Sequence, residues 1–314
     1  MPAVAPILVP MSAPHADLHQ MDLHYADLTH DVLADLSNQH GVDFATTLFY
    51  EKIRRSPEHG TFIGEVESIE TDPSAPLPRI PGKLLVAPAA FWKEYPMFGG
   101  DGRLIRRVAE QFGLETRLAP VPSTASVTRA AEVLAEELQR YGDGEVVLAS
   151  LSKGGADVRV AIQRWPEIAR KVRIWLQVGG LLHGSPVVSG LLTSSWWRRG
   201  LVRGYLAYTR ADPQFMRELA WGPSTLLSPR TSAPPGMEVI SIVGFPLACH
   251  LRGAVARRHR RMSALGPNDG STLLRDAMVD GGLVYPVWGA DHYMRVPGIE
   301  RLLHRVFVYI ARRP

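Results

Sequence analysis

A serine between an apolar strand and a glycine-rich helix start is the first residue of this chain that could do chemistry. Residues 146–155 read VVLASLSKGG, and Ser152 lies on the turn. A hydroxyl on such a turn projects beyond the sheet, and the free N–H groups of the helix start favour a developing oxyanion. The turn needs small residues two positions before and after the serine, where Ser150 and Gly154 stand. Alone, the pattern also fits an ordinary polar turn of a doubly wound sheet.

An acid and a base follow, each in a loop after an expected strand. Asp269 lies in the segment GPNDG, and His292 lies in WGADHY. Nucleophilic catalysis by serine needs an imidazole to take the hydroxyl proton and a carboxylate to hold the imidazole in the right tautomer. Pro-Asn-Asp-Gly is a rigid turn that can fix a carboxylate, which favours Asp269 as the acid.

Three other aspartates lie near the expected histidine loop and could orient its imidazole: Asp276, Asp280 and Asp291. Asp291 directly precedes His292, and adjacent side chains usually point apart. We therefore expect Asp291 to cap or brace this loop.

The serine turn and the chain order serine, acid, histidine resemble the α/β-hydrolase superfamily, and more narrowly its lipase and esterase branches. The resemblance covers roughly residues 80–314, and the first glycine of the family's G-x-S-x-G motif is Ser150 here. It implies an α/β-hydrolase fold with Ser152 as nucleophile, Asp269 as acid and His292 as general base.

The same resemblance implies an oxyanion hole built from two backbone N–H groups. One is that of Lys153, and the other comes from the segment PAAFW at 88–92, where we expect Ala90 and where the family usually has a glycine near Ala89. The Lys153 side chain could stabilise an anionic intermediate, select an acidic substrate or simply point to solvent.

Aromatic residues suggest a substrate with an apolar acyl group or a bulky hydrophobic alcohol. The candidate substrate-binding residues are Phe91, Trp92, Trp196, Trp197 and His183. His183 lies in GGLLHGSP, which resembles the Gly-Ser-Pro loop of lipases; it is either a pocket residue or a hydrogen-bonded structural histidine.

Apolar runs alternate with helical periodicity along most of the chain. Expected strands cover residues 83–87, 114–118, 145–149, 172–178, 238–244 and 283–288. Expected helices cover residues 29–55 with a break at Gly41 and an end at Pro57, and residues 104–112, 127–141 and 154–165. Because parallel strands need long crossovers, this order predicts an α/β fold with a mostly parallel central sheet and helices on both faces.

The pattern divides the chain into an N-terminal arm and helical extension (1–80) and a catalytic domain (81–314). A proline-rich connector at 71–78 precedes the domain, and an aromatic-rich stretch at about 187–236 predicts a helical cap insertion or a pair of packed surface helices. The first 80 residues could form a structural layer, a dimerisation arm or part of the site entrance.

Composition narrows the function classes. The 314 residues, 46% hydrophobic and 21% charged, are typical of a soluble globular protein, and no run is long enough to cross a bilayer. The N-terminus lacks the features of a secretory signal, so we expect a cytoplasmic protein. Cys249 is the only cysteine, which excludes an intramolecular disulfide, and we expect it as a small buried thiol. No metal-ligand spacing is present, so neither a metal nor a cofactor is expected.

The net charge of +4 gathers mainly in two runs, 196–199 and 257–261. The second is either a solvated helix face or a nucleic-acid or membrane patch, and the lack of a nucleic-acid motif favours the first. We expect a small-molecule ester substrate, no nucleic acid and no stable membrane insertion; a homo-oligomer is compatible with the sequence.

The sequence thus favours a hydrolase that cleaves a hydrophobic carboxylic ester through an acyl-enzyme on Ser152. Thioester hydrolysis or acyl transfer would use the same triad. The alternative of another class is a non-catalytic relative that binds a small molecule, but such proteins generally lack a triad residue.

Overall fold

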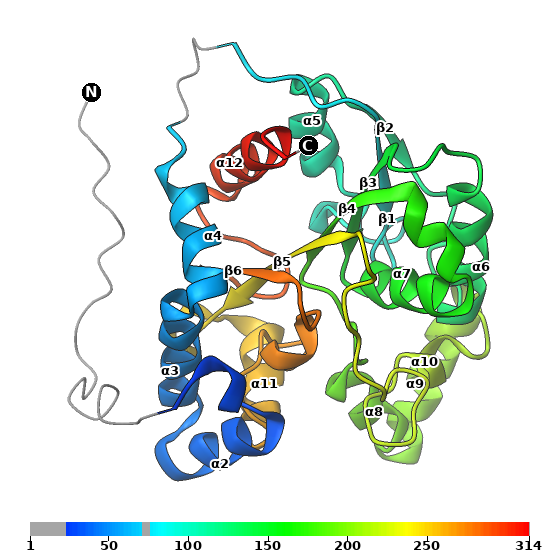
Figure 1. Ribbon diagram of the computed structural model, residues 1–314. Helices are drawn as coiled ribbons and strands as arrows, with labels where there is room; N and C mark the ends of the chain where they lie inside the picture. The colour runs from blue at the N-terminus through cyan, green and yellow to red at the C-terminus, as the bar shows by residue number, and fades with distance from the viewer. Residues whose placement is uncertain (1–22, 71–75, 314) are drawn as a thin grey trace.

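The computed structural model, which describes residues 23–70 and 76–313, contains one six-stranded sheet in which every strand is parallel to its neighbours (Figure 1). The strand order is β2-β1-β3-β4-β5-β6. The strands are β1 (Lys83–Ala87), β2 (Glu115–Leu118), β3 (Val146–Leu151), β4 (Val172–Val178), β5 (Glu238–Phe245) and β6 (Leu283–Trp288).

Both faces of the sheet are buried, which is why its central strands are almost continuously apolar. Within β1, Leu84 and Val86 pack into one hydrophobic core, and Leu85 and Ala87 pack into a second core on the opposite face. Successive side chains of a strand point to opposite faces, so each central strand supplies both cores.

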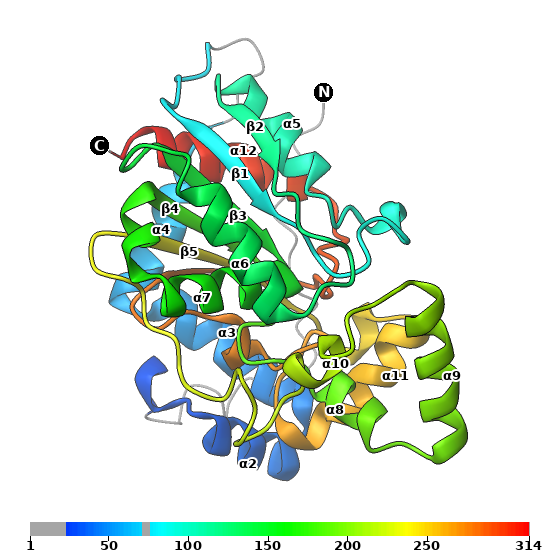
Figure 2. The same cartoon turned by 90° about the vertical axis from the view of Figure 1, so that its right-hand side faces the viewer.

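Helices cover the two faces, as Figures 1 and 2 show. The first core includes residues of α3, α4, α5 and α12, and the second includes residues of α6 and α7. The α-helices described are α2 (His30–His40), α3 (Val42–Arg55), α4 (Pro57–Ser68), α5 (Arg103–Gln111), α6 (Val127–Leu138), α7 (Lys153–Arg164), α8 (Pro186–Leu192), α9 (Trp196–Tyr208), α10 (Phe215–Glu218), α11 (Gly253–Met262) and α12 (Ile299–Ala311).

The N-terminal helices α2, α3 and α4 form a layer beside β6 (Figure 1). Phe49 of α3 packs against Phe245 with ring centroids 5.5 Å apart, and Phe62 of α4 packs against Tyr309 at 4.9 Å. The expected end of the helix before Pro57 is confirmed, since α3 ends at Arg55. Pro57 also opens α4, which was not expected, and Ser56 caps this helix by accepting the His59 N–H. Proline suits the first helical position, where no intrahelical N–H bond is lost.

Between β4 and β5 the chain forms α8, α9 and α10, which lie with α11 at one end of the molecule (Figure 2). Several large apolar side chains of α9 are exposed, among them Trp196 and Leu201. In the described part of the chain, no helix is long and apolar enough to cross a membrane. Most of the expected N-terminal arm (1–22) and the first part of the connector (71–75) lie outside the described residues.

Candidate active site

The turn between β3 and α7 holds Ser152 in a strained conformation. Its φ of 50° and ψ of −115° are rare for a residue with a side chain, and such strain concentrates at functional turns. Gly154 makes the turn possible, because a Cβ there would lie only 2.3 Å from the carbonyl oxygen of Ala87. The local sequence therefore raises the Ser152 hydroxyl beyond the end of the strand.

Ser150, which replaces the motif's first glycine, is fully buried beneath this turn. Its hydroxyl accepts a hydrogen bond of 2.8 Å from the indole N–H of Trp175 in β4. A glycine would leave this buried indole donor without its partner, which costs free energy. The departure from the motif thus has a packing reason in the neighbouring strand.

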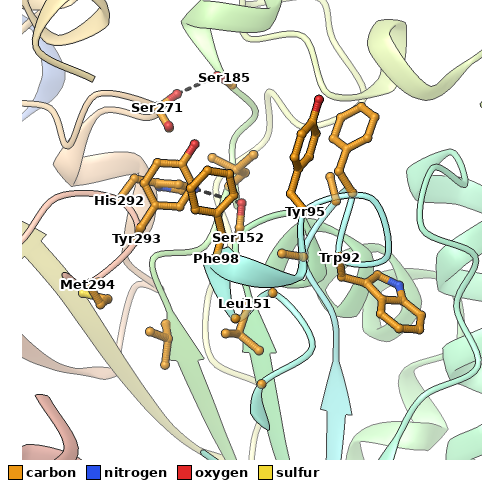
Figure 3. Close-up of a pocket in the computed structure, with 18 of the residues that line it drawn as sticks. Trp92, Tyr95, Phe98, Leu151, Ser152, Ser185, Ser271, His292, Tyr293 and Met294 are labelled. Atoms are coloured by element: carbon orange, nitrogen blue, oxygen red, sulfur yellow. Dashed lines mark hydrogen bonds between the residues drawn. The ribbon is translucent and has the colours of Figure 1, made fainter. Parts of the chain in front are cut away.

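The structure brings Ser152, His292 and Asp269 together although they are far apart in the chain. The Ser152 Oγ lies 2.9 Å from Nε2 of His292 (Figure 3). Nδ1 of His292 lies 2.8 Å from a carboxylate oxygen of Asp269. The other Asp269 oxygen accepts the backbone N–H groups of Ser271 and Thr272. With Nδ1–H donating to the carboxylate, the lone pair of Nε2 faces the serine hydroxyl and can accept its proton.

The alternative acids lie elsewhere. Asp276 is 2.8 Å from Nε2 of His30 and also accepts the indole N–H of Trp221, while Asp280 accepts from Arg275. Asp291 accepts the backbone N–H of Tyr293 and is bound by the guanidinium of Arg295, which confirms that it braces the histidine loop.

Two backbone N–H groups beside Ser152 are free to donate. The Ala89 N–H donates to Gly100 and the Phe91 N–H donates to Ser123, whereas the Ala90 N–H between them has no acceptor among the described residues. The N–H of Lys153, at the first position of α7, is likewise without an acceptor there, as is usual for a first-turn group. The two N–H groups expected for an oxyanion hole are therefore both without an acceptor in the described structure.

The Lys153 side chain points neither to solvent nor into the site. It is 2% exposed, and its Nζ lies 2.6 and 2.8 Å from the two carboxylate oxygens of Asp157, one helical turn further along α7. Burial raises the pKa of the Asp157 carboxyl to about 7, and the Lys153 ammonium opposes this rise. The expected uses of the Lys153 charge are therefore wrong, because its charge is bound within the protein.

Ser152 opens into a cavity of about 450 Å³ with a largely apolar lining. Phe91 and Trp92 belong to this lining, as expected. The expectation for Trp196 and Trp197 is wrong, since neither lines the cavity and their side chains are 79% and 49% exposed on α9. His183 also lies outside the lining; it is buried, and this burial lowers its pKa to about 4.

The cavity has lining residues that the sequence analysis missed. The rings of Phe98 and Tyr293 stack with centroids 4.7 Å apart beside Ser152 and His292 (Figure 3). Ser185 donates a hydrogen bond to the backbone oxygen of Ser271, joining two loops at the cavity. Tyr293 follows the histidine directly and could have been suspected, but Phe98 ends a three-residue 3-10 helix (Pro96–Phe98), which is too short to give a periodic signal.

No protein-family model and no curated protein matches the sequence of this chain. Solved structures are nevertheless similar. The metagenomic carboxyl esterase MGS0156 is 17% identical with a TM-score of 0.55, over 90% of each chain. The propeptide form of Bacillus licheniformis lipase BlEst2 is 18% identical with a TM-score of 0.52, over 76% of this chain and 53% of the lipase.

Phospholipase PlaB from Legionella pneumophila is also similar, at 12% identity and a TM-score of 0.51, over 74% of this chain and 59% of PlaB. At such low identities the likeness concerns the fold. It agrees with the parallel sheet described above and confirms the expected fold class, the α/β-hydrolase fold.

Proposed function

We propose that this protein is a serine hydrolase that cleaves carboxylic esters, with Ser152 as nucleophile, His292 as general base and Asp269 as the acid that orients it. The observation that carries the proposal is the hydrogen-bonded chain from Asp269 through His292 to a strained serine at the wall of an apolar cavity. A serine, a base and an orienting acid in this geometry are what acyl transfer to serine requires.

In the first half of the reaction, Nε2 of His292 takes the hydroxyl proton while Oγ of Ser152 attacks the ester carbonyl. The developing oxyanion accepts hydrogen bonds from the N–H groups of Lys153 and Ala90. The tetrahedral intermediate then collapses, and its alcohol oxygen leaves with the proton held on Nε2. Asp269 stabilises the transient imidazolium without taking its proton.

In the second half, a water molecule attacks the acyl-enzyme. His292 removes one proton from this water, the same two N–H groups receive the oxyanion, and Ser152 regains its proton as the carboxylic acid leaves. The two halves use the same residues, with Ser152 as nucleophile in the first half and as leaving group in the second, so no further group is needed.

The cavity wall favours a hydrophobic substrate. Its size is within the range of small-molecule sites, and aliphatic and aromatic side chains surround the serine, among them Leu181, Phe215 and Leu219. An apolar acyl chain in this space would bury its surface at a gain of about 25 cal/mol per Å².

The test is turnover of p-nitrophenyl esters of increasing acyl length by the wild type and by Ser152→Ala. We expect hydrolysis by the wild type and a loss of at least about 10³-fold in the variant, because the nucleophile is gone. Ser68→Ala removes a hydroxyl from an exposed position on α4 and should leave the rate unchanged.

Hydrolysis that survives in Ser152→Ala would refute the proposal. If the wild type hydrolyses none of these esters, labelling by a fluorophosphonate probe separates two cases. If the probe labels the wild type but not Ser152→Ala, the protein has a working nucleophile and a narrower substrate range than these esters. If the probe does not label the wild type, the protein has no working nucleophile.

A further inference from the structure

A second hollow, of about 470 Å³, adjoins the catalytic cavity. The two share three lining residues, Phe98, Arg258 and Tyr293, so they meet at the stacked aromatic pair. The rest of the second lining comes from His250 and Arg252 just before α11, from the first turn of α11 and from the histidine loop. We name this hollow the basic groove, for the reason that follows.

The groove carries excess positive charge. Arg252 and Arg258 both line it, and neither lies within ion-pair distance of a carboxylate among the described residues. Arg258 donates to the Tyr293 hydroxyl, but its Nε is buried with no hydrogen-bond partner in the described part of the chain. The carboxylate in the lining, Asp291, is already bound by Arg295.

The start of α11 adds backbone N–H donors, which also favour a negatively charged ligand. The helix begins at Gly253 without an acidic residue in its first turn and without a side-chain cap. In the described structure, the N–H groups of Gly253, Ala254 and Val255 have no acceptor, and all three residues line the groove. Free N–H groups at a helix start attract anions, and here two arginines reinforce them.

The position of the groove indicates which part of a substrate would reach it. In the proposed reaction the alcohol oxygen takes its proton from Nε2 of His292, so the alcohol part leaves on the histidine side. The oxyanion donors, Lys153 and Ala90, lie on other elements. The groove borders the histidine loop through Asp291 and Tyr293, which places it beside the leaving alcohol rather than beside the acyl chain.

On the basis of the proposed function, we propose that the substrate is an ester whose acyl part is apolar and whose alcohol part carries an anionic group, a phosphate or a carboxylate. The acyl part occupies the catalytic cavity. The alcohol part passes the Phe98–Tyr293 pair, and its anion is held by Arg252, Arg258 and the start of α11.

The first test compares wild-type kcat/KM for octanoyl-glycerophosphate and octanoylglycerol, which share an acyl chain and differ by the phosphate. The octanoyl ester of glycolate and ethyl octanoate form the matching carboxylate pair. We expect the anionic member of at least one pair to be preferred by about tenfold or more, because hydrogen bonds to charged groups are the stronger kind. The preference should shrink as salt is added.

The second test assigns the preference to the groove. Arg252→Gln and Arg258→Gln should each lower the ratio of anionic to neutral kcat/KM by about tenfold, since each removes a cation that contacts the anion. Arg260→Gln is the matched control, because it removes the same charge from an exposed position of α11 outside the groove. In this variant the ratio of anionic to neutral kcat/KM should be unchanged.

The outcomes separate the two proposals. Hydrolysis of neutral and anionic esters with equal kcat/KM would overturn the anionic substrate and leave the esterase proposal standing. A preference that survives both arginine changes would overturn the role of the groove. Failure of wild-type hydrolysis and of fluorophosphonate labelling would overturn the proposed function itself, and this inference with it.

Discussion

Two buried histidines in different regions of the molecule show what makes an imidazole useful. His292, in a loop at the carboxyl ends of the strands, has both ring nitrogens hydrogen-bonded, one to Ser152 and one to Asp269. His59, in the N-terminal helical layer, is also buried, but neither ring nitrogen has a partner in the described chain. It packs edge-on against Tyr25 at 4.7 Å.

The two environments have different physical consequences. Burial lowers the pKa of His59 to about 4, with Arg275 adding to the effect, so this ring stays neutral and behaves as an apolar body. At His292 the carboxylate is placed to stabilise the cation that forms when a proton arrives. Burial without a partner therefore keeps the His59 ring neutral, whereas the two ring nitrogens of His292 contact a nucleophile and an acid. We expect changes at the strand ends to alter activity first, and changes in the helical layer to alter stability first.

Among the variants that test this comparison, Asp269→Asn should have the largest effect, and this effect is on catalysis. The amide keeps the shape of the side chain but would offer an N–H to Nδ1 of His292 and favour the wrong tautomer, so the rate should fall by about 10³–10⁴-fold. Urea unfolding should change much less. A variant with near wild-type kcat/KM, measured on the best ester, would show that another group orients the imidazole.

Phe49→Ala should lower stability and leave catalysis nearly unchanged. Phe49 is fully buried between the helical layer and β5, and its removal should lower the free energy of unfolding by about 3–5 kcal/mol. The rate per folded molecule should change little. Tyr208→Ala is the matched control, because that ring is 86% exposed and its loss should cost less than about 0.5 kcal/mol. A loss of catalysis in folded Phe49→Ala would tie the layer directly to the site.

His59→Phe tests the histidine of the layer through pH. As pH falls from 6.5 toward 4, His59 becomes protonated in the unfolded chain but stays neutral in the folded one. The unfolded state therefore binds more protons, and stability falls over this window. Phenylalanine removes that contribution, and the loss of stability between pH 7 and pH 5, measured by urea unfolding, should be smaller than in the wild type. His183, whose pKa is also lowered to about 4, should retain part of the slope. An unchanged slope would mean that His59 is solvated or bonded in solution.

The smallest effect is expected for Trp196→Ala. This side chain is exposed on α9 and does not line the cavity, so kcat/KM for a short soluble ester should change by less than about twofold. Phe215→Ala removes a lining ring and should weaken turnover of longer esters more strongly. Equal losses in the two variants would indicate that α9 contacts the substrate during turnover.

The sheet could be predicted from the sequence because its strands are short apolar runs bounded by helices. The expected bounds of β1, β4 and β6 agree with the structure, and the helix break at Gly41 is confirmed. The helix expected from residue 127 begins there, where the Ser126 hydroxyl caps it by accepting the N–H of Arg129. In each case the signal is local, so neighbouring residues suffice to determine it.

Local signals are ambiguous where a residue type suits two structural environments. Pro57 indicates the end of one helix, which is correct for α3, but it also marks the start of α4, because Ser56 before it is a good helix cap and proline favours a first turn. Cys249 was expected in the core but is exposed, because β5 ends at Phe245 and the chain then turns outward. Arg258 belongs to a run interpreted as a solvated helix face, yet its Nε is buried.

The sequence by itself determined the parallel sheet, the turn that presents Ser152 and the order in which acid and base follow it. Only the tertiary structure decided that Asp269 rather than Asp276 or Asp280 meets His292, that Lys153 is bound by Asp157, and that a basic groove adjoins the cavity. The physical reason is distance along the chain. The Ser152–His292 contact joins residues 140 positions apart, and it lies in loops whose course follows from the packing of the elements they connect rather than from any local period.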